Sequence, residues 1–149
     1  MSDPAVTAAV PDQVQIVKQL YEAFAGRRIE EILPLLASDV AWSEPPNPLN
    51  PAAGTRHGHA GFLEWARLGG EAEEILVLRP EQYLRATDTV AVVGFARCRV
   101  RRTGRVYDTD FVHLVRLRGA QVVRFQEFFD TYAATEAFRT QGATGSDAA

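Results

Sequence analysis

The sequence has little of the chemistry that marks several large protein classes. It has a single cysteine, Cys98, and three histidines in 149 residues. One cysteine excludes an intramolecular disulfide and any zinc site built from several cysteines. No apolar run approaches the roughly 20 residues that a membrane-spanning helix needs. The opening Met1-Ser2-Asp3-Pro4 lacks the basic and apolar regions of a signal peptide. We therefore expect a cytoplasmic protein that does not enter a membrane.

A large basic excess is also missing. The chain has 16 Lys and Arg against 19 Asp and Glu, which gives a formal net charge of −3. This balance argues against nucleic-acid binding. Seven arginines do gather between positions 97 and 118, but few aromatic side chains accompany them for base stacking. We interpret them as a solvated outer face that pairs with acids, for which the candidates are Glu71, Glu73, Glu74 and Glu81.

The composition that remains is that of one globular domain. Hydrophobic residues make up 46% of the chain and charged residues 23%, and a chain of this length can bury a substantial core. The ends, 1–11 and 140–149, are rich in small residues and predict flexible tails. We expect a single domain over 12–139.

Helical patterns fill the first half. Asp12 and Gln15 form a capping-box variant before apolar residues at helical spacing, which predicts a helix that ends near Gly26. A second short helix over 29–36 contains Pro34, so we expect it to be broken. A strand over 40–44 follows, and then a long proline-rich loop over 45–56. A third helix is predicted over 59–68, and Phe62 is one of its apolar residues.

The second half has the period of two that is typical of strands. Strands are predicted over 75–78, 83–86, 90–102, 106–117 and 122–129, with tight turns at 103–105 and 118–120, and a last helix over 132–138. Short connections imply antiparallel neighbours. Helices followed by an antiparallel meander indicate an α+β fold.

Alternation along these strands separates two faces of the sheet. The face that the helices would cover carries the small Ala96 and Cys98 and a mainly apolar set, Phe111, Val115, Val123, Phe125 and Phe129. Two ionisable residues, His113 and Glu127, interrupt this set. A buried polar group costs about 1–3 kcal/mol without a partner, so we expect His113 and Glu127 to pair.

The opposite face is also partly apolar, because it carries Val112, Leu114 and Phe128. A sheet with apolar patches on both sides usually covers the second side with another chain. We therefore expect a homodimer formed through this outer face.

Four stretches resemble the NTF2-like superfamily, which includes ketosteroid isomerases and SnoaL-like polyketide cyclases. They are VKQLYEAFAGR (17–27), LASDVAWSEP (36–45), HGHAGF (57–62) and DFVHLVRLRGAQVVRFQEFFDT (110–131). The resemblance covers roughly 12–138. It implies a cone-shaped fold in which N-terminal helices pack on a curved, mostly antiparallel sheet around a pocket. We expect the residues that bind a ligand in this pocket to be Trp42, Phe62, Ala96, Cys98, Phe111, Val115, Phe125 and Phe129.

The resemblance also implies site residues. In ketosteroid isomerases a first-helix tyrosine donates to the substrate oxygen, and Tyr21 matches it. Glu44, before Pro45, takes the place of the general-base aspartate, and His113 that of a protonated aspartate. In SnoaL-like cyclases an aspartate at the end of the last strand acts as acid or base, which Phe129-Asp130 resembles.

Each assignment has a structural alternative. Glu44 shares a strand face with Trp42, whose indole would raise the pKa of a neighbouring carboxyl, yet Glu44 could be an exposed acid before a turn. His113 could be a satisfied core histidine, Glu127 a plain ion-pair partner, and Tyr21 a core residue. Asp130 is favoured as a helix N-cap, and Cys98 as a small filler. His57 and His59 lack a third ligand, so no metal site is expected.

Three functions stay open at this point. The first is a cofactor-independent acid/base enzyme, an isomerase or cyclase, acting on a small apolar molecule that bears a carbonyl. The second is a binding module without turnover. The third, epoxide hydrolysis, needs an Asp-Arg-Asp set from Arg85, Arg97 or Arg99 with Asp110 or Asp130. Alternation points Arg97, Arg99 and Asp110 away from the pocket.

Overall fold

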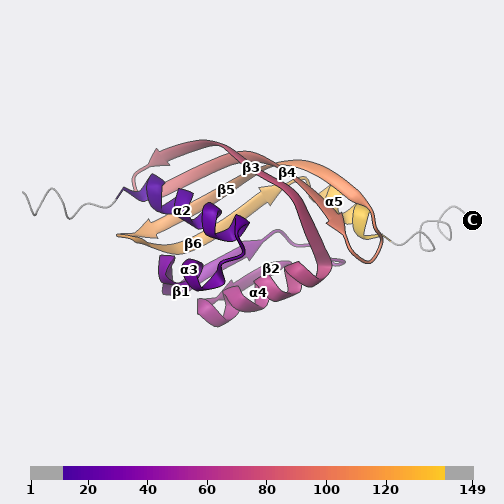
Figure 1. Cartoon of the computed structure of the whole chain (residues 1–149), viewed down its shortest axis with the longest axis horizontal. Helices are drawn as coiled ribbons and strands as arrows, with labels where there is room; N and C mark the ends of the chain where they lie inside the picture. Colours follow the sequence, from indigo (N-terminus) through magenta and orange to yellow (C-terminus); the bar gives the residue numbers. More distant parts are fainter. Residues whose placement is uncertain (1–11, 140–149) are drawn as a thin grey trace, which may run out of the picture.

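The fold is a curved sheet with helices on its concave side (Figure 1). The structure, a computed structural model, describes residues 12–139. Residues 1–11 and 140–149, for which the sequence predicts tails, lie outside the described residues. No helix within 12–139 is long and apolar enough to cross a membrane.

The described residues form four α-helices, one short 3-10 helix and six strands. The helices are α2 (Gln13–Ala25), α3 (Ile29–Ile32), the 3-10 helix η1 (Leu33–Leu35), α4 (Gly58–Ala72) and α5 (Thr131–Phe138). The strands are β1 (Leu36–Glu44), β2 (Gly54–His57), β3 (Glu73–Ala86), β4 (Thr89–Val100), β5 (Val106–Arg118) and β6 (Gln121–Phe129). The α+β class predicted from the sequence is confirmed.

Local sequence explains the first helices. The Asp12 carboxylate accepts a hydrogen bond from the backbone N–H of Gln15, at 3.2 Å, and caps α2 as predicted. The next helix is broken as predicted, because Pro34 lacks an N–H and the chain tightens there into η1. Val17, Leu20 and Tyr21 are the buried face of α2.

The sheet runs in the order β2-β1-β6-β5-β4-β3. All neighbours are antiparallel except β1 and β6, which are parallel and aligned with Trp42 opposite Phe125 and Ser43 opposite Gln126. This long-range pairing places Glu44, the last residue of β1, beside Glu127 of β6. It decides the geometry of the site described below.

Several boundaries differ from the sequence prediction. Residues 54–56, predicted as the end of the loop, belong to the edge strand β2 (Gly54–His57). Helix α4 continues through Gly69 and Gly70 to Ala72, because Ala66 and Leu68 still pack on the core. The two predicted strands 75–78 and 83–86 are one strand, β3, whose register shifts on either side of Pro80 accommodate a residue without an N–H.

A second register shift changes which side chains of β6 face the helices. The register between β5 and β6 shifts next to Arg116 and Leu117. Because a shift of one residue moves side chains to the opposite face, Val122 is fully buried and Val123 is only partly buried. The prediction that Val123 lies on the helix-covered face was wrong, whereas Phe125, beyond the shift, does lie there.

Packing against neighbouring strands explains why β4 carries a glycine, Gly94, on its small-residue face. A β-carbon on Gly94 would clash with the Arg79 carbonyl and the Phe111 ring. The space left by this glycine therefore lets the Phe111 ring lie flat against the sheet. At the far end, α5 packs Ala134, Ala137 and Phe138 against β4 and β5.

Candidate active site

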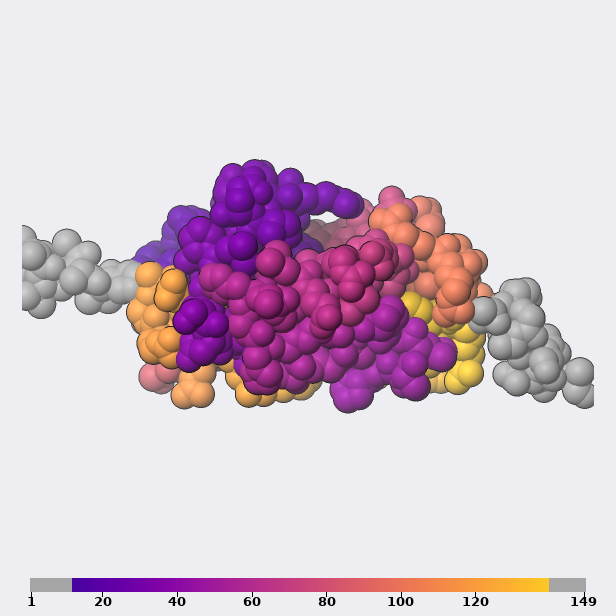
Figure 2. Space-filling view, turned by 90° about the horizontal axis from the view of Figure 1, so that it is seen from below, coloured from indigo at the N-terminus to yellow at the C-terminus, as the bar shows by residue number. Residues whose placement is uncertain are grey.

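A cavity of about 670 Å³ lies between helices α2 and α4 and the concave face of the sheet. Ten residues that the sequence singled out line it: Tyr21, Trp42, Glu44, Ala96, Cys98, Phe111, His113, Phe125, Glu127 and Phe129. The space-filling view shows the molecule hollowed between the indigo segment with α2 and the magenta segment with α4 (Figure 2).

Three other predicted site residues do not line this cavity. Phe62 is fully buried behind it, with its ring 4.7 Å from that of Trp42. Val115 is also fully buried. Asp130 is exposed and caps α5, accepting from the Ala133 N–H at 3.0 Å. The predicted ligand contacts of Phe62 and Val115 and the acid/base role of Asp130 are therefore corrected to packing and capping roles.

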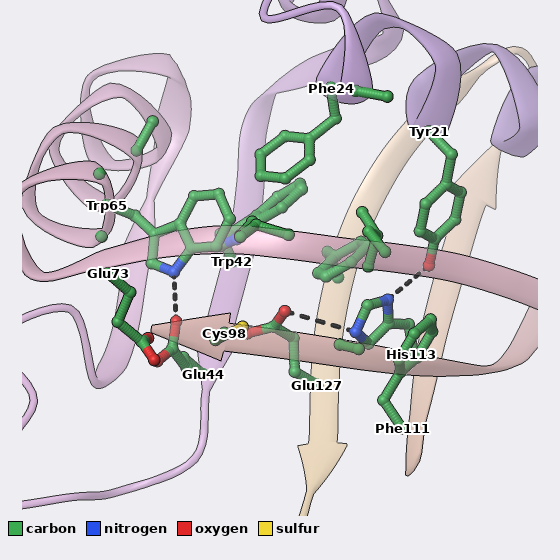
Figure 3. Close-up of a pocket in the computed structure, with 18 of the residues that line it drawn as sticks. Tyr21, Phe24, Trp42, Glu44, Trp65, Glu73, Cys98, Phe111, His113 and Glu127 are labelled. Atoms are coloured by element: carbon green, nitrogen blue, oxygen red, sulfur yellow. Dashed lines mark hydrogen bonds and ion pairs between the residues drawn. The ribbon is translucent and has the colours of Figure 1, made fainter. Parts of the chain in front are cut away.

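The walls of the cavity are aromatic. The Trp42 indole stacks on the Phe125 ring, with centroids 4.0 Å apart and planes 4° apart. The Trp65 ring lies 5.0 Å from that of Trp42 and 5.9 Å from that of Phe24. Figure 3 shows Trp65, Trp42 and Phe24 above Glu73, Glu44, Glu127 and His113 in this view. A ligand would be held between an apolar wall and a polar one.

The first part of the polar row joins α2 to the sheet. Tyr21 and His113 share a short hydrogen bond between the hydroxyl and Nδ1. His113 Nε2 lies 3.4 Å from Glu127 Oε1, and the two residues are cross-strand partners in β5 and β6. His113 is also stacked against Phe111, with ring centroids 4.2 Å apart. The predicted contact between His113 and Glu127 is therefore present.

The second part of the row centres on Glu44. Its Oε1 accepts a hydrogen bond from Trp65 Nε1 at 2.7 Å, and its Oε2 accepts one from Asn50 Nδ2 at 2.5 Å. Asn50 is itself fixed, because its side-chain oxygen accepts from the Ala52 N–H at 2.9 Å. Two donors therefore hold Glu44 as a carboxylate within the cavity wall.

Burial shifts the pKa values of this row strongly. Burial raises the pKa of Glu127 well above its usual value, and the charge of Glu44, a hydrogen bond with it and the charge of Glu73 raise it further. Burial lowers the pKa of His113 to about 3. Burial, followed by the charge of Glu127, raises the pKa of the Tyr21 hydroxyl. At neutral pH His113 and Tyr21 are therefore uncharged, and the surroundings of Glu127 favour its protonated form.

One proton assignment satisfies every group in the row. The Tyr21 hydroxyl donates to His113 Nδ1, and His113 then carries its proton on Nε2, which faces Glu127. The Glu127 carboxyl keeps its own proton and donates it to Glu44, which also accepts from Trp65 and Asn50. We assign the tautomer from this network. A single negative charge then sits on Glu44 and is shared among three donors.

A second polar group, which the sequence analysis missed, faces the same cavity. The Tyr107 hydroxyl donates a short hydrogen bond to Glu73 Oε2. Burial raises the pKa of Glu73 to about 7, the Tyr107 hydrogen bond opposes that rise, and the charge of Glu44 adds to it. Burial also raises the pKa of the Cys98 thiol to about 12, so it is not a nucleophile at neutral pH.

These missed residues left different signals. Tyr107 continues the alternation of Phe111 and His113 backwards along β5, so extending that series would have found it. Glu73 was interpreted as a partner of surface arginines, but Glu74 fills that role with Arg99 at 2.9 Å. Trp65 and Asn50 reach Glu44 only through the tertiary fold and gave no local signal.

The alternative sites of the sequence analysis do not face the cavity. Arg97 pairs with Asp108 at 2.7 Å on the exposed face, and Asp110 and Asp130 are exposed. The Asp-Arg-Asp set for epoxide hydrolysis is therefore not assembled. His57 precedes α4, and the ring of His59 bonds the Leu36 carbonyl at 2.9 Å. Within 12–139, no group of three or more His, Cys, Asp or Glu is arranged to hold a metal ion.

Comparison with known proteins agrees with this architecture. The chain matches the SnoaL-like domain family over residues 17–125. An NTF2-like protein from Burkholderia xenovorans LB400 is 33% identical, with a TM-score of 0.76, and the match covers 85% of this chain and 95% of that one. An NTF2-like protein of unknown function from Burkholderia pseudomallei K96243 is 28% identical, with a TM-score of 0.79, over 86% of this chain and 98% of that one.

A third solved structure contains a ligand. TerC, co-crystallized with polyporic acid, is 28% identical, with a TM-score of 0.70, over 85% of this chain and 97% of that one. The curated proteins gave no match. The family match extends over well over half of the sequence, and the resemblance stated from the residues alone is confirmed. The chain belongs to the SnoaL-like family and has the NTF2-like fold.

Proposed function

We propose that this protein is a cofactor-independent acid/base enzyme that transfers a proton on a small, mostly apolar molecule bearing a carbonyl group. The observation that supports this most is the pairing of two carboxyl groups, Glu127 and Glu44, in the wall of one aromatic cavity, where burial and the charge of Glu44 raise the pKa of Glu127. Two carboxyl groups whose surroundings separate their protonation states are typical of acid/base sites.

Glu127 is the proposed general acid. Its proton passes to the carbonyl oxygen as negative charge develops there. Tyr21 acts on Glu127 through His113, so both are positioning residues in this scheme. The solved structure of TerC with polyporic acid supports a small-molecule ligand in a fold of this kind.

Glu73 is the proposed general base. Glu44 was the base expected from the sequence, but its oxygens are occupied by hydrogen bonds with Trp65, Asn50 and Glu127. Glu73 lines the same cavity and accepts one short hydrogen bond, from Tyr107. Its pKa of about 7 lies where a base works best at neutral pH. It would remove a proton from the carbon next to the carbonyl, and Glu44 would keep Glu127 protonated.

The test is exchange of the hydrogens next to a carbonyl, which needs no knowledge of the natural substrate. 1-Tetralone is an apolar bicyclic ketone, and its exchange with deuterium in heavy water is followed by proton NMR. We expect the protein to accelerate exchange over an equal concentration of the Glu73→Gln variant by about 100-fold or more. Glu71→Gln, on the exposed face of α4, is the matched control and should leave the rate unchanged.

Binding must be measured alongside exchange, because the alternative is a module that binds without turnover. Trp42 and Trp65 are the chain's two tryptophans and both line the cavity. Quenching of their fluorescence therefore reports occupancy. Quenching by 1-tetralone without accelerated exchange would favour the non-catalytic alternative and contradict the proposed enzyme.

A further inference from the structure

The charged residues that line the cavity differ in sign between its exposed edge and its buried interior. Of the residues that line it, the exposed ones surround the opening, and the ionisable members of that exposed set are all arginines: Arg27, Arg67 and Arg101. The acidic lining residues, Glu44, Glu73 and Glu127, are buried or half-buried. A cationic rim therefore surrounds an interior whose ionisable groups are mainly carboxyls.

The rim arginines come from three separate parts of the fold. Arg27 follows the end of α2, Arg67 lies in α4, and Arg101 follows the end of β4. These segments meet at the opening only in the folded chain. The sequence analysis placed Arg101 among a solvated arginine group, but its position at the opening separates it from Arg97 and Arg99 on the outer face.

Arg27 occupies a position that favours glycine. Its φ is +56°, in the left-handed region, while Gly26 just before it has a φ of −84°. A glycine at 27 would end the helix without strain. The guanidinium of Arg27 makes no hydrogen bond or ion pair within residues 12–139. Backbone strain combined with an unpaired charge at the opening points to a use for this side chain outside the fold itself.

The other two arginines are held in place but retain free donors. Arg101 Nε donates to the Gly70 carbonyl at 2.8 Å, which fixes its side chain and leaves its terminal nitrogens without a partner in the described part of the chain. Arg67 pairs with Glu71 at 3.2 Å in an exposed i,i+4 ion pair, which is weak and readily exchanged for another anion.

We propose that the arginine rim, defined as Arg27, Arg67 and Arg101, binds a carboxylate of a ligand whose apolar body fills the cavity. Guanidinium groups bind carboxylates through two parallel hydrogen bonds. The charges of Glu44 and Glu73 would repel an anion that entered further. The ligand is therefore an aromatic or otherwise apolar carboxylic acid with its carboxylate at the rim and its opposite end facing Glu127. This inference rests on the proposed function only in placing an apolar body inside.

The experiment compares two probes of nearly equal shape, biphenyl-4-carboxylate and biphenyl-4-carboxamide. Binding is measured by titration calorimetry and by quenching of the cavity tryptophans. We expect the carboxylate to bind the full chain about tenfold more tightly than the amide at low salt. The preference should shrink as sodium chloride rises from about 20 mM to about 500 mM, because salt screens exposed charges.

Substitutions assign the preference to the rim. Arg27→Gly should fold at least as well as the parent, with an unchanged or higher thermal midpoint, because glycine suits the backbone there. It should reduce the carboxylate preference about threefold or more, and Arg27→Gly combined with Arg67→Gln and Arg101→Gln should abolish it. Arg97→Gln, an exposed arginine on the outer face, is the matched control and should leave the preference unchanged.

The outcomes separate this inference from the proposed function. Equal binding of both probes, or a preference that survives the triple variant, would overturn the rim as a carboxylate site while the acid/base proposal stands. If neither probe binds, the cavity does not accept an apolar aromatic body, and both proposals are contradicted. A rim preference in a protein that does not accelerate exchange on 1-tetralone would support the rim and contradict the enzyme alone.

Discussion

Glu44 and Glu127 form a pair of interacting carboxyl groups although 83 positions separate them in the sequence (127 against 44). They lie one residue beyond the Ser43–Gln126 pair in the parallel strands β1 and β6. Trp65 and Asn50 donate to Glu44, whereas Glu127 receives only the contact with His113 on its other side. The burial of Glu127 and the charge of Glu44 beside it raise the pKa of Glu127.

Replacing Tyr21 with phenylalanine should destabilise the fold by about 1–2 kcal/mol, because His113 Nδ1 loses its partner while buried. The free energy of unfolding is measured by urea denaturation. Tyr132→Phe is the matched control, because Tyr132 is 75% exposed. If Tyr21→Phe is as stable as Tyr132→Phe, the hydrogen bond from Tyr21 to His113 does not stabilise the fold.

Glu73→Gln should remove the rise of exchange activity with pH. In the parent, the rate should rise through pH 7 as Glu73 loses its proton. Stability should change in the opposite direction. The folded-state pKa is above the unfolded value, so the folded state binds the proton more tightly and stability is lost as pH rises from about 4.5 to about 7.

The same variant should therefore gain stability relative to the parent at high pH. We expect the difference in the free energy of unfolding between Glu73→Gln and the parent to grow by about 2 kcal/mol from pH 5 to pH 8, with some reduction for partial exposure. Glu71→Gln should show no such growth. A constant difference would contradict the raised pKa of Glu73.

His113→Asn should flatten the loss of stability in acid. The folded-state pKa of His113, about 3, is below its unfolded value near 6.5, so stability is complete above pH 6.5 and falls as pH drops toward 3. This one group contributes a slope of up to about 1.4 kcal/mol per pH unit. The exposed His57→Asn should keep the slope of the parent. A parent slope retained in His113→Asn would show that His113 is not buried neutral.

The outer face of the sheet is the proposed dimer interface. Phe128, on that face, is 46% exposed, and Val112 and Leu114 beside it are only partly buried. We expect the parent to sediment as a dimer and Phe128→Arg to sediment as a monomer, because an unpaired charge in a buried interface is costly. Leu63→Arg, at the cavity opening on the other side, should remain dimeric. A parent that is monomeric at high concentration would contradict the proposal.

Local patterns were enough to predict much of the fold. The capped helix α2, the break at Pro34 and the alternating strands β4 to β6 depend on nearby residues, so the sequence shows them. The edge strand β2 and the continuous β3 were missed because proline and glycine suggest breaks that long-range pairing overrides. The inward face of Val122 depends on a bulge, which a strict period of two does not reveal.

In the candidate site, too, some residues could be predicted from local patterns and others depend on long-range contacts. Alternation and the family resemblance identified His113, Glu127, Glu44 and Tyr21 as facing one cavity. Asp130 was carried over from the resemblance and proved to be a cap. Asn50 and Trp65, which donate to Glu44, lie 6 and 21 residues after it, in a loop and in helix α4. Their contribution depends on how the loop folds back, which no local pattern specifies.

The most direct test of the account is the protonation state of Glu127 at neutral pH. Carbon-13 NMR of the full chain, with its glutamate side-chain carboxyls labelled, resolves protonated from ionised groups, and Glu44→Gln, Glu73→Gln and Glu127→Gln assign the signals. We predict a carboxyl that stays protonated at pH 7 and disappears in Glu127→Gln. A Glu127 that titrates near its ordinary value of about 4.5 would contradict the proposed acid and the proton network built on it.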